Sequence, residues 1–416
     1  MKITDRQALR TAVDKAVSEV QITDVHTHLY GPCFGDLLLW GVDELITYHY
    51  LVAETFRHTD VSYKAFWAMS RRGQADLIWK HLFDENSPYS EACRGILTTL
   101  QQLGLEVGAR DLGAYRAFFE AKGVEEYVEQ VFTLARVKEV VMTNDPFLEA
   151  ERAIWLEAYR ADPRFRAALR LDELLNGWAR SWRLLREWGY STEEQISDRT
   201  VAEVRRFLTE WAGRMDAVYL AASLPPTFAF PEDSPRGRLI VECVLPVCQE
   251  LNLPFAMMIG VKKLVNPDLR GAGDSVGKAD IDVVEYLCSE FPRNKFLVTM
   301  LARENQHELC VVARKFRNLL VFGCWWFLNN PSLVEEITRM RFELLGTSVV
   351  PQHSDARVLD HLIYKWHHSR KTIANVLYDK YADLMATGWL PREAEIQRDV
   401  ENLFGGTFWK FLKRKM

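Results

Sequence analysis

Eight short apolar runs, spread along the chain and rich in residues that favour strands, are the feature that most limits the fold. Segments with helical periodicity separate most of these runs, for example residues 200–214 and 236–250. Strands that alternate with helices form a parallel sheet, and eight such units predict an α/β fold, the (β/α)8 or TIM barrel. The predicted strands are residues 22–28, 140–143, 165–171, 217–223, 255–259, 295–301, 319–326 and 346–350.

Two stretches do not fit the simple alternation. Residues 34–136 lie between the first two predicted strands and have mostly helical, aromatic-rich patterns, which predicts a helical cap inserted in the first βα connection. Residues 358–416 are also helix-patterned and too long for one closing helix, so we expect a C-terminal helical extension. With 416 residues, of which 48% are hydrophobic, the chain can build one large barrel domain over residues 1–416.

Composition excludes several classes of partner. Lys and Arg total 52 against 57 Asp and Glu, so the chain has no basic field for nucleic acid or for an anionic membrane. No apolar run approaches the roughly 20 residues that span a bilayer. The seven cysteines lie mostly inside apolar runs, which is typical of reduced, buried thiols and predicts a cytoplasmic protein. Assembly into a homo-oligomer stays open.

A His-x-His pattern ends the first predicted strand, in Gln21-Ile-Thr-Asp-Val-His-Thr-His-Leu29. Side chains two positions apart on a strand point the same way, so His26 and His28 can bind one metal ion together. The alternative is a pair of histidines that are hydrogen-bonded inside the core, because short motifs often match by chance.

Polar residues follow most of the predicted strands, at the end of the barrel where catalytic groups lie in this fold. The last strand is followed by Asp355, and the first and last strands become neighbours when the barrel closes. His26, His28 and Asp355 therefore form the predicted metal site. Two imidazoles and one carboxylate suit one divalent ion with open positions for water and substrate; we expect Zn2+, with Mn2+ or another divalent ion left open.

A first-strand His-x-His with a last-strand Asp resembles the amidohydrolase superfamily of metal-dependent barrels. Members with two metals usually add a lysine after strand four and histidines after strands five and six. The corresponding segments here are Ala221-Ala-Ser-Leu-Pro-Pro226, Ala256-Met-Met-Ile-Gly260 and Met300-Leu-Ala-Arg303. A binuclear hydrolase is therefore disfavoured.

A narrower resemblance rests on four further motifs: Tyr48-His-Tyr50, Ala168-Leu-Arg-Leu-Asp172, Phe322-Gly-Cys-Trp-Trp-Phe327 and Ser354-Asp-Ala-Arg357. Together with the two histidines they are similar to the uronate (glucuronate) isomerases of that superfamily, over essentially the whole chain. The resemblance implies an intramolecular oxidoreductase that interconverts D-glucuronate with D-fructuronate and D-galacturonate with D-tagaturonate in bacterial hexuronate breakdown. The alternatives are a mononuclear metal-dependent hydrolase and a barrel that binds sugar acids without catalysis.

Aldose–ketose isomerisation by proton transfer through an enediolate needs a base, an acid and a cation for the developing oxyanion. Asp355 is expected to bind the metal and to take part in proton transfer. Tyr50 is a candidate proton shuttle, whose phenol needs a lowered pKa to act as a base. Arg357 can neutralise the enediolate oxygen, and His49 can position a hydroxyl. Whether Tyr50 or Asp355 is the base stays open.

Substrate binding is assigned to Arg170, His49, Tyr50, Arg357, Trp325 and Trp326. The guanidinium of Arg170 is a planar fork that matches the uronate carboxylate, while the two tryptophans form an apolar wall. Each assignment has a structural alternative: Arg170 and Arg357 can be ordinary ion-pair partners, and the two cap residues can be ordinary packing.

Overall fold

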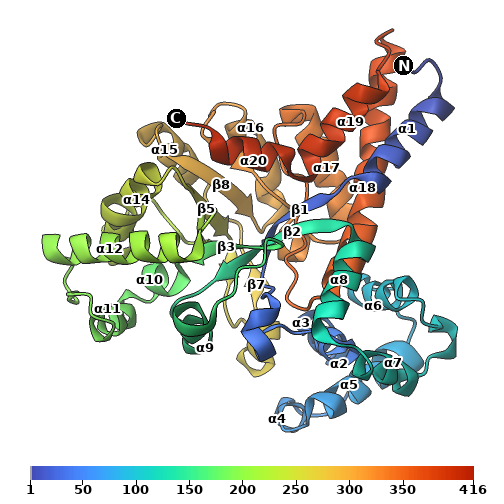
Figure 1. The fold of residues 1–416 in the computed structure, drawn as a ribbon, viewed down its shortest axis with the longest axis horizontal. Helices are drawn as coiled ribbons and strands as arrows, with labels where there is room; N and C mark the ends of the chain where they lie inside the picture. Colours follow the sequence, from blue (N-terminus) through green and yellow to red (C-terminus); the bar gives the residue numbers. More distant parts are fainter. Residues whose placement is uncertain (1) are drawn as a thin grey trace.

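Seven parallel strands form the central sheet of the computed structural model, which describes residues 2–416 (Figure 1). Their order in the sheet is β1-β2-β3-β4-β5-β8-β9, and every neighbouring pair is parallel. The strands are β1 (Ile22–Thr27), β2 (Val137–Asn144), β3 (Phe165–Arg170), β4 (Leu220–Leu224), β5 (Pro254–Ile259), β8 (Lys295–Met300) and β9 (Leu319–Val321).

The eighth strand position is reduced to a single parallel bridge between Phe322 and Val350. The segment that follows closes the barrel onto β1: Asp355 N donates to His26 O at 3.2 Å, and His28 N donates to Ala356 O at 2.7 Å. The predicted (β/α)8 fold class is therefore confirmed, as a seven-stranded sheet closed by this segment.

The last two predicted strands are shorter than expected. Residues 346–350 were predicted as a strand, but Gly346 ends helix α17 (Pro331–Leu345) and the bridge is limited to Val350. Pro351 follows and has no N–H to extend the pairing. Residues 319–326 form a strand only to Val321, because the backbone turns at Gly323 with φ of 68°. A Cβ there would lie 1.8 Å from the ring of His353, so the close approach requires glycine.

The connection from β1 to β2 is helical. It contains α2 (Val42–Ile46), α3 (His49–Thr55), α4 (Tyr63–Trp67), α5 (Arg71–Trp79), α6 (Glu91–Gln102), α7 (Leu112–Glu120) and α8 (Val124–Ala135), with short turns at Pro32–Leu37, Lys80–Asp84 and Val107–Ala109. Several of these helices begin at a side-chain cap; Ser62 and Ser70, for example, each accept from the third backbone N–H of their helix at 3.2 Å. That this segment is a cap separate from the barrel stays a prediction.

The remaining helices surround the barrel. They include α9 (Glu149–Ala153), α10 (Asp172–Asn176), α11 (Trp178–Glu187), α12 (Asp198–Met215), α13 (Pro235–Leu239), α14 (Leu245–Glu250), α15 (Asp282–Glu290) and α16 (Gln306–Ala313), after α1 (Arg6–Glu19). A small antiparallel ribbon, β6 (Val261–Lys262) with β7 (Ser275–Val276), follows β5. The chain ends with α18 (His361–Ala386), α19 (Glu393–Glu401) and α20 (Thr407–Lys413). None of the helices in residues 2–416 combines the length and the apolar character needed to cross a membrane.

The barrel interior is filled by one small or branched side chain from each strand and is closed at one end by α20. This inner cluster contains Val25, Val141, Ala168, Ala221, Ala256, Leu297, Leu320 and Val350, with Phe408 and Phe411 of α20. A separate, larger cluster packs between the sheet and the outer helices. Figure 1 shows α20 on the opposite side of the molecule from α2–α7. The interior is therefore a packed core, and the polar site lies at the other end.

Candidate active site

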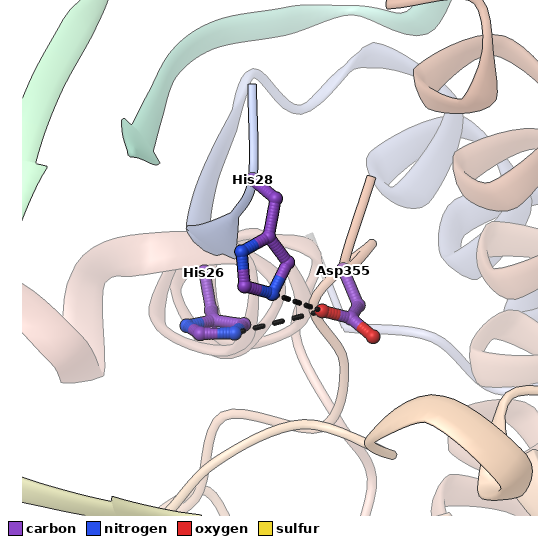
Figure 2. Close-up of side chains that lie close together, drawn as sticks. All are labelled: His26, His28 and Asp355. Atoms are coloured by element: carbon purple, nitrogen blue, oxygen red, sulfur yellow. Dashed lines mark ion pairs between the residues drawn. The ribbon is translucent and has the colours of Figure 1, made fainter. Parts of the chain in front are cut away.

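The three predicted metal ligands lie together at the carboxyl ends of the first and last strand positions. Nε2 of His26 and of His28 lie 3.5 and 3.3 Å from Oδ1 of Asp355 (Figure 2). One ligand atom from each of the three residues lies within 4.8 Å of the others. His26 and Asp355 are buried, while His28 is partly exposed. The arrangement is compact enough for one ion.

Two hydroxyl groups set the tautomers of the histidines. Thr143 Oγ1 donates its proton to Thr27 O at 2.9 Å, so it accepts from Nδ1 of His28, also at 2.9 Å. Likewise, Tyr219 OH donates to Val25 O at 2.9 Å and lies 3.4 Å from Nδ1 of His26. Each imidazole therefore keeps its proton on Nδ1 and turns the lone pair of Nε2 toward Asp355.

This arrangement of lone pairs fits a cation. Nε2 of His26 and Oδ1 of Asp355 are buried without a hydrogen-bond partner in residues 2–416. Burial, helped by the charge of Arg357, lowers the pKa of His28 well below its ordinary value, so this ring is neutral, as a metal ligand must be.

The predicted cap residues reach the same site from the start of α3. The rings of Tyr48 and Tyr50 lie 4.0 and 4.5 Å from the ring of His49, measured between centroids, and Trp326 lies 5.5 Å from it. The hydroxyls of both tyrosines, His49 Nε2 and Trp326 Nε1 are buried and have no hydrogen-bond partner in residues 2–416. Such a gathering of unpaired polar atoms is typical of a ligand site, because each costs about 1–3 kcal/mol when left unpaired.

Protonation distinguishes the roles open to these residues. Burial raises the pKa of Tyr50 well above its ordinary value, and the neighbouring Tyr48 and Asp355 add to the effect. The lowered pKa that a base would need is therefore not found, and the phenol keeps its proton near neutral pH. Burial, with the charge of Arg357, lowers the pKa of His49 to about 3, so that this ring is neutral.

The two predicted arginines differ in their surroundings. Arg357 is exposed at the rim of the site, and no carboxylate in residues 2–416 pairs with it. Arg170, at the end of β3, donates from Nε and Nη2 to Oδ2 of Asp172 at 2.9 and 2.5 Å. The ion-pair alternative for Arg170 is thus realised, although Nη1 makes no hydrogen bond within residues 2–416. Burial would lower the pKa of Arg170, but Asp172 and Asp145 raise it.

A cavity of about 500 Å³ opens beside this pair, over the carboxyl ends of β2 to β5. Its lining includes Asp145, Asp172, Ser223, Arg236 and Lys263. Trp325 and Trp326 are both buried, and Trp326 has a left-handed backbone with φ of 46°. The tryptophans therefore supply an apolar surface, and Trp326 also offers an indole N–H.

Comparison with solved structures decides the family. The uronate isomerase of Bacillus halodurans is 60% identical in sequence, with a TM-score of 0.98, and the match covers 99% of this chain and 98% of that one. The chain belongs to the uronate isomerase family. The uronate isomerase of Thermotoga maritima (16% identity, TM-score 0.78, 97% of both chains) and the glucuronate isomerase of Caulobacter crescentus (15%, 0.76, 98% of this chain and 94% of that one) share the fold.

No family model and no curated protein matches the sequence, so membership in the uronate isomerase family rests on the structural comparison. It favours an isomerase over the two alternatives, a metal-dependent hydrolase and a non-catalytic barrel. His368 of α18 lies outside this site: its Nδ1 is 2.7 Å from Glu91 Oε1, where α18 meets α6.

Sequence reasoning missed several polar residues that surround the candidate site. Thr143 and Tyr219 orient the histidines, and His353 is fully buried beside His26, with ring centroids 5.0 Å apart. Asp24 and Lys365 contact the backbone next to Asp355. Asp24 and His353 stand beside known motifs, but nothing in their spacing predicts which atoms they contact.

Proposed function

We propose that this chain is a uronate isomerase that interconverts D-glucuronate with D-fructuronate and D-galacturonate with D-tagaturonate. One observation carries the proposal: a chain 60% identical to a uronate isomerase over nearly its whole length brings His26, His28 and Asp355 together and leaves buried polar groups of the site unpaired in residues 2–416. The substrate is then a small uronate sugar. The cysteines of this chain are free, and all except Cys33 are buried, which supports a location in the reducing cytoplasm.

The metal site is part of the proposal. His26, His28 and Asp355 would hold one divalent ion, which we take to be Zn2+. The ion would supply positive charge for substrate oxygens on which negative charge develops. The two hydroxyl-oriented imidazoles hold their lone pairs ready for it, so little reorganisation is needed on binding.

Proton transfer is assigned to Asp355 and Tyr50. Figure 2 shows the second oxygen of Asp355 turned away from both imidazoles, so it can accept the proton from the sugar carbon. Tyr50 keeps its proton and is therefore placed as the donor. Arg357 has no carboxylate partner and is free to balance the charge of the enediolate, while neutral His49 can hold a sugar hydroxyl.

The carboxylate of the sugar is assigned to Arg170. Its pair with Asp172 uses Nε and Nη2, which leaves Nη1 for the substrate. Asp172 also accepts from Ser223 N at 2.7 Å, so the pair is fixed to β4 and holds the guanidinium in one orientation. Trp325 and Trp326 would then contact the apolar face of the sugar.

The test is turnover of the purified protein with glucuronate and with galacturonate, followed by ketose formation without a redox cofactor. Tyr50→Phe should lower kcat by about two to four orders of magnitude, as loss of a proton donor does. Tyr89→Phe is the matched control, because that tyrosine is 84% exposed. In deuterated water, proton transfer through an enediolate admits solvent label into the product, whereas a direct hydride shift does not.

Absence of ketose from both sugars, in protein that carries its metal, would refute the isomerase proposal. Unlabelled product together with full turnover in Tyr50→Phe would refute the proton-transfer roles alone.

A further inference from the structure

Asp355 has an unusual backbone for a residue at the centre of the site. Its φ is 51°, in the left-handed region that residues with a Cβ rarely adopt. The carboxylate points at both imidazoles only while this conformation is kept. Something other than its local preference must therefore hold the backbone at this position.

The preceding residue, Ser354, is hydrogen-bonded through both its backbone N–H and its backbone C=O. Ser354 N donates to Oδ1 of Asp24 at 3.0 Å, and Ser354 O accepts from Nζ of Lys365 at 2.6 Å. Its side-chain oxygen also accepts from Ala356 N at 3.1 Å. Ser354 therefore has little freedom to rotate, and the turn at Asp355 starts from a fixed point.

Asp24 and Lys365 are themselves buried and fixed, while a third side chain, Asn329, donates from Nδ2 to Ser354 O at the longer distance of 3.3 Å. Asp24 lies in β1 and is 0% exposed, and its Oδ2 accepts from Nε1 of Trp366 at 2.8 Å. Lys365, the neighbour of Trp366 in α18, is 4% exposed. Burial lowers the pKa of Lys365 to about 8 and raises the pKa of Asp24, so both charges are costly to keep inside.

A methionine would fill the space of Lys365 without that cost, so the stability of the fold does not by itself account for a buried ammonium here. The one hydrogen bond that Lys365 Nζ makes within residues 2–416 is donated to the carbonyl of Ser354, next to Asp355. This placement ties the lysine to the geometry of the site.

We propose that Asp24 and Lys365 are positioning residues, which grip the N–H and the C=O of Ser354 and so fix Asp355 in the left-handed conformation that aims its carboxylate at His26 and His28. The inference deepens the proposed function, because it rests on the role given there to Asp355. Both residues would act through Ser354.

The chain contains a matched control for Lys365. Lys295, at the start of β8, is 2% exposed, donates from Nζ to the backbone carbonyl of Leu412, and has a pKa that burial lowers to about 8. It lies at the opposite end of the barrel, under α20. Lys365→Met and Lys295→Met therefore remove the same kind of contact at the two ends.

The first measurement is hydrogen exchange of the backbone amides of residues 353–357, which requires neither metal nor substrate. We expect exchange in Lys365→Met to be at least about tenfold faster than in wild type, and unchanged in Lys295→Met. Zn2+ affinity, measured by competition with a chelator, should fall about tenfold or more in Lys365→Met alone. For turnover, kcat should fall at least about tenfold while KM changes less than about threefold.

If Lys365→Met does not fold, Asp24→Asn tests the other contact, between Asp24 and Ser354 N. Asn has one acceptor oxygen, so it can serve Ser354 N–H or Trp366 Nε1–H but not both, and the same exchange increase is expected. Lys365→Arg keeps a charge and a donor and should restore much of the lost affinity. Equal exchange in Lys365→Met, Asp24→Asn and Lys295→Met would overturn the inference. A wild type without isomerase activity would refute the proposed function but leave the exchange result interpretable.

Discussion

The two ends of the barrel differ in whether their buried polar groups are hydrogen-bonded. At the end closed by α20, Asn294 Nδ2 donates to Leu245 O at 2.7 Å and Asn318 Nδ2 to Cys288 O at 3.1 Å. At the other end, His26, Tyr50, Trp326 and Asp355 each keep a buried polar atom without a partner in residues 2–416. One end therefore contributes stability, and the other keeps its hydrogen-bonding capacity for a ligand.

The difference has a simple energetic reading. Each unpaired group at the site end costs about 1–3 kcal/mol, and binding can recover this energy when a ligand pairs with it. The apolar side chains buried in the inner cluster, including Phe408 and Phe411 of α20, provide stabilisation that offsets this cost. Changes at the site end should therefore alter binding and turnover, and changes at the α20 end should alter stability.

The largest effect is expected for His26→Ala. Structural metal sites bind with about 10 kcal/mol or more, so loss of one of three ligands should weaken binding at least about a thousandfold. Elemental analysis should find less than about a tenth of the wild-type metal content. His367→Ala, an exposed histidine on α18, is the control. Equal metal in both variants would remove His26 from the site, and two tightly bound ions per wild-type chain would revive the hydrolase alternative.

Phe408→Ala tests the other end of the comparison. Phe408 is fully buried inside the barrel, and its truncation should lower the free energy of unfolding by about 3–5 kcal/mol. Denaturant unfolding measures this loss. At a temperature where the variant is folded, kcat and KM should stay within about twofold of wild type. A large loss of kcat in fully folded Phe408→Ala would show that the two ends are not independent.

Arg170→Met should lower kcat/KM for uronates by about two orders of magnitude, because a charge-assisted pair with the carboxylate is worth about 2–4 kcal/mol. Arg180→Met is matched to it: Arg180 also pairs with a carboxylate, Glu173, but is 73% exposed. Steady-state kinetics compares the two. If Arg170→Met and Arg180→Met both match wild type, Arg170 is only a structural partner of Asp172.

The smallest effect concerns the pH dependence of stability at the site end. Burial raises the pKa of Glu151 to about 7, although Tyr30 OH and Asp145 N donate to it. An acid whose pKa is raised by folding stabilises the folded state at low pH, and this contribution is lost as pH rises from about 5 to about 8. Glu151→Gln should remove on the order of 1–3 kcal/mol of that loss. Urea unfolding at both pH values measures this change in the free energy of unfolding. The same change in wild type and in Glu151→Gln would contradict the raised pKa of Glu151.

Much of the fold followed from the sequence because strand and helix periods are local. Seven of the predicted strands form where apolar runs were found, although β2 starts earlier, at Val137. The shortening of the last two strands could not be predicted, because it depends on Gly323 passing the ring of His353 and on Pro351 ending the pairing at Val350. Those constraints exist only once distant segments meet.

The proximity of the proposed metal ligands could be predicted from the sequence, but the side chains that support them could not. The positions of His26, His28 and Asp355 follow from strand geometry and barrel closure. The hydroxyls of Thr143 and Tyr219 and the grip on Ser354 depend on the direction of individual hydrogen bonds. The sequence left open whether Arg170 binds a ligand or is an ordinary ion-pair partner; the structure shows its pair with Asp172, two positions away.

Barrel closure also has a consequence for the order of folding events. Ser354 meets Asp24 across 330 positions of the chain, so this contact has a very high contact order and a large entropic cost of loop closure. Local helices and neighbouring strands can form earlier, but the proposed metal ligands come together only when the first and last segments pair. Metal uptake during refolding should therefore coincide with the last cooperative phase, and only chains in which the first and last segments have paired should bind the ion.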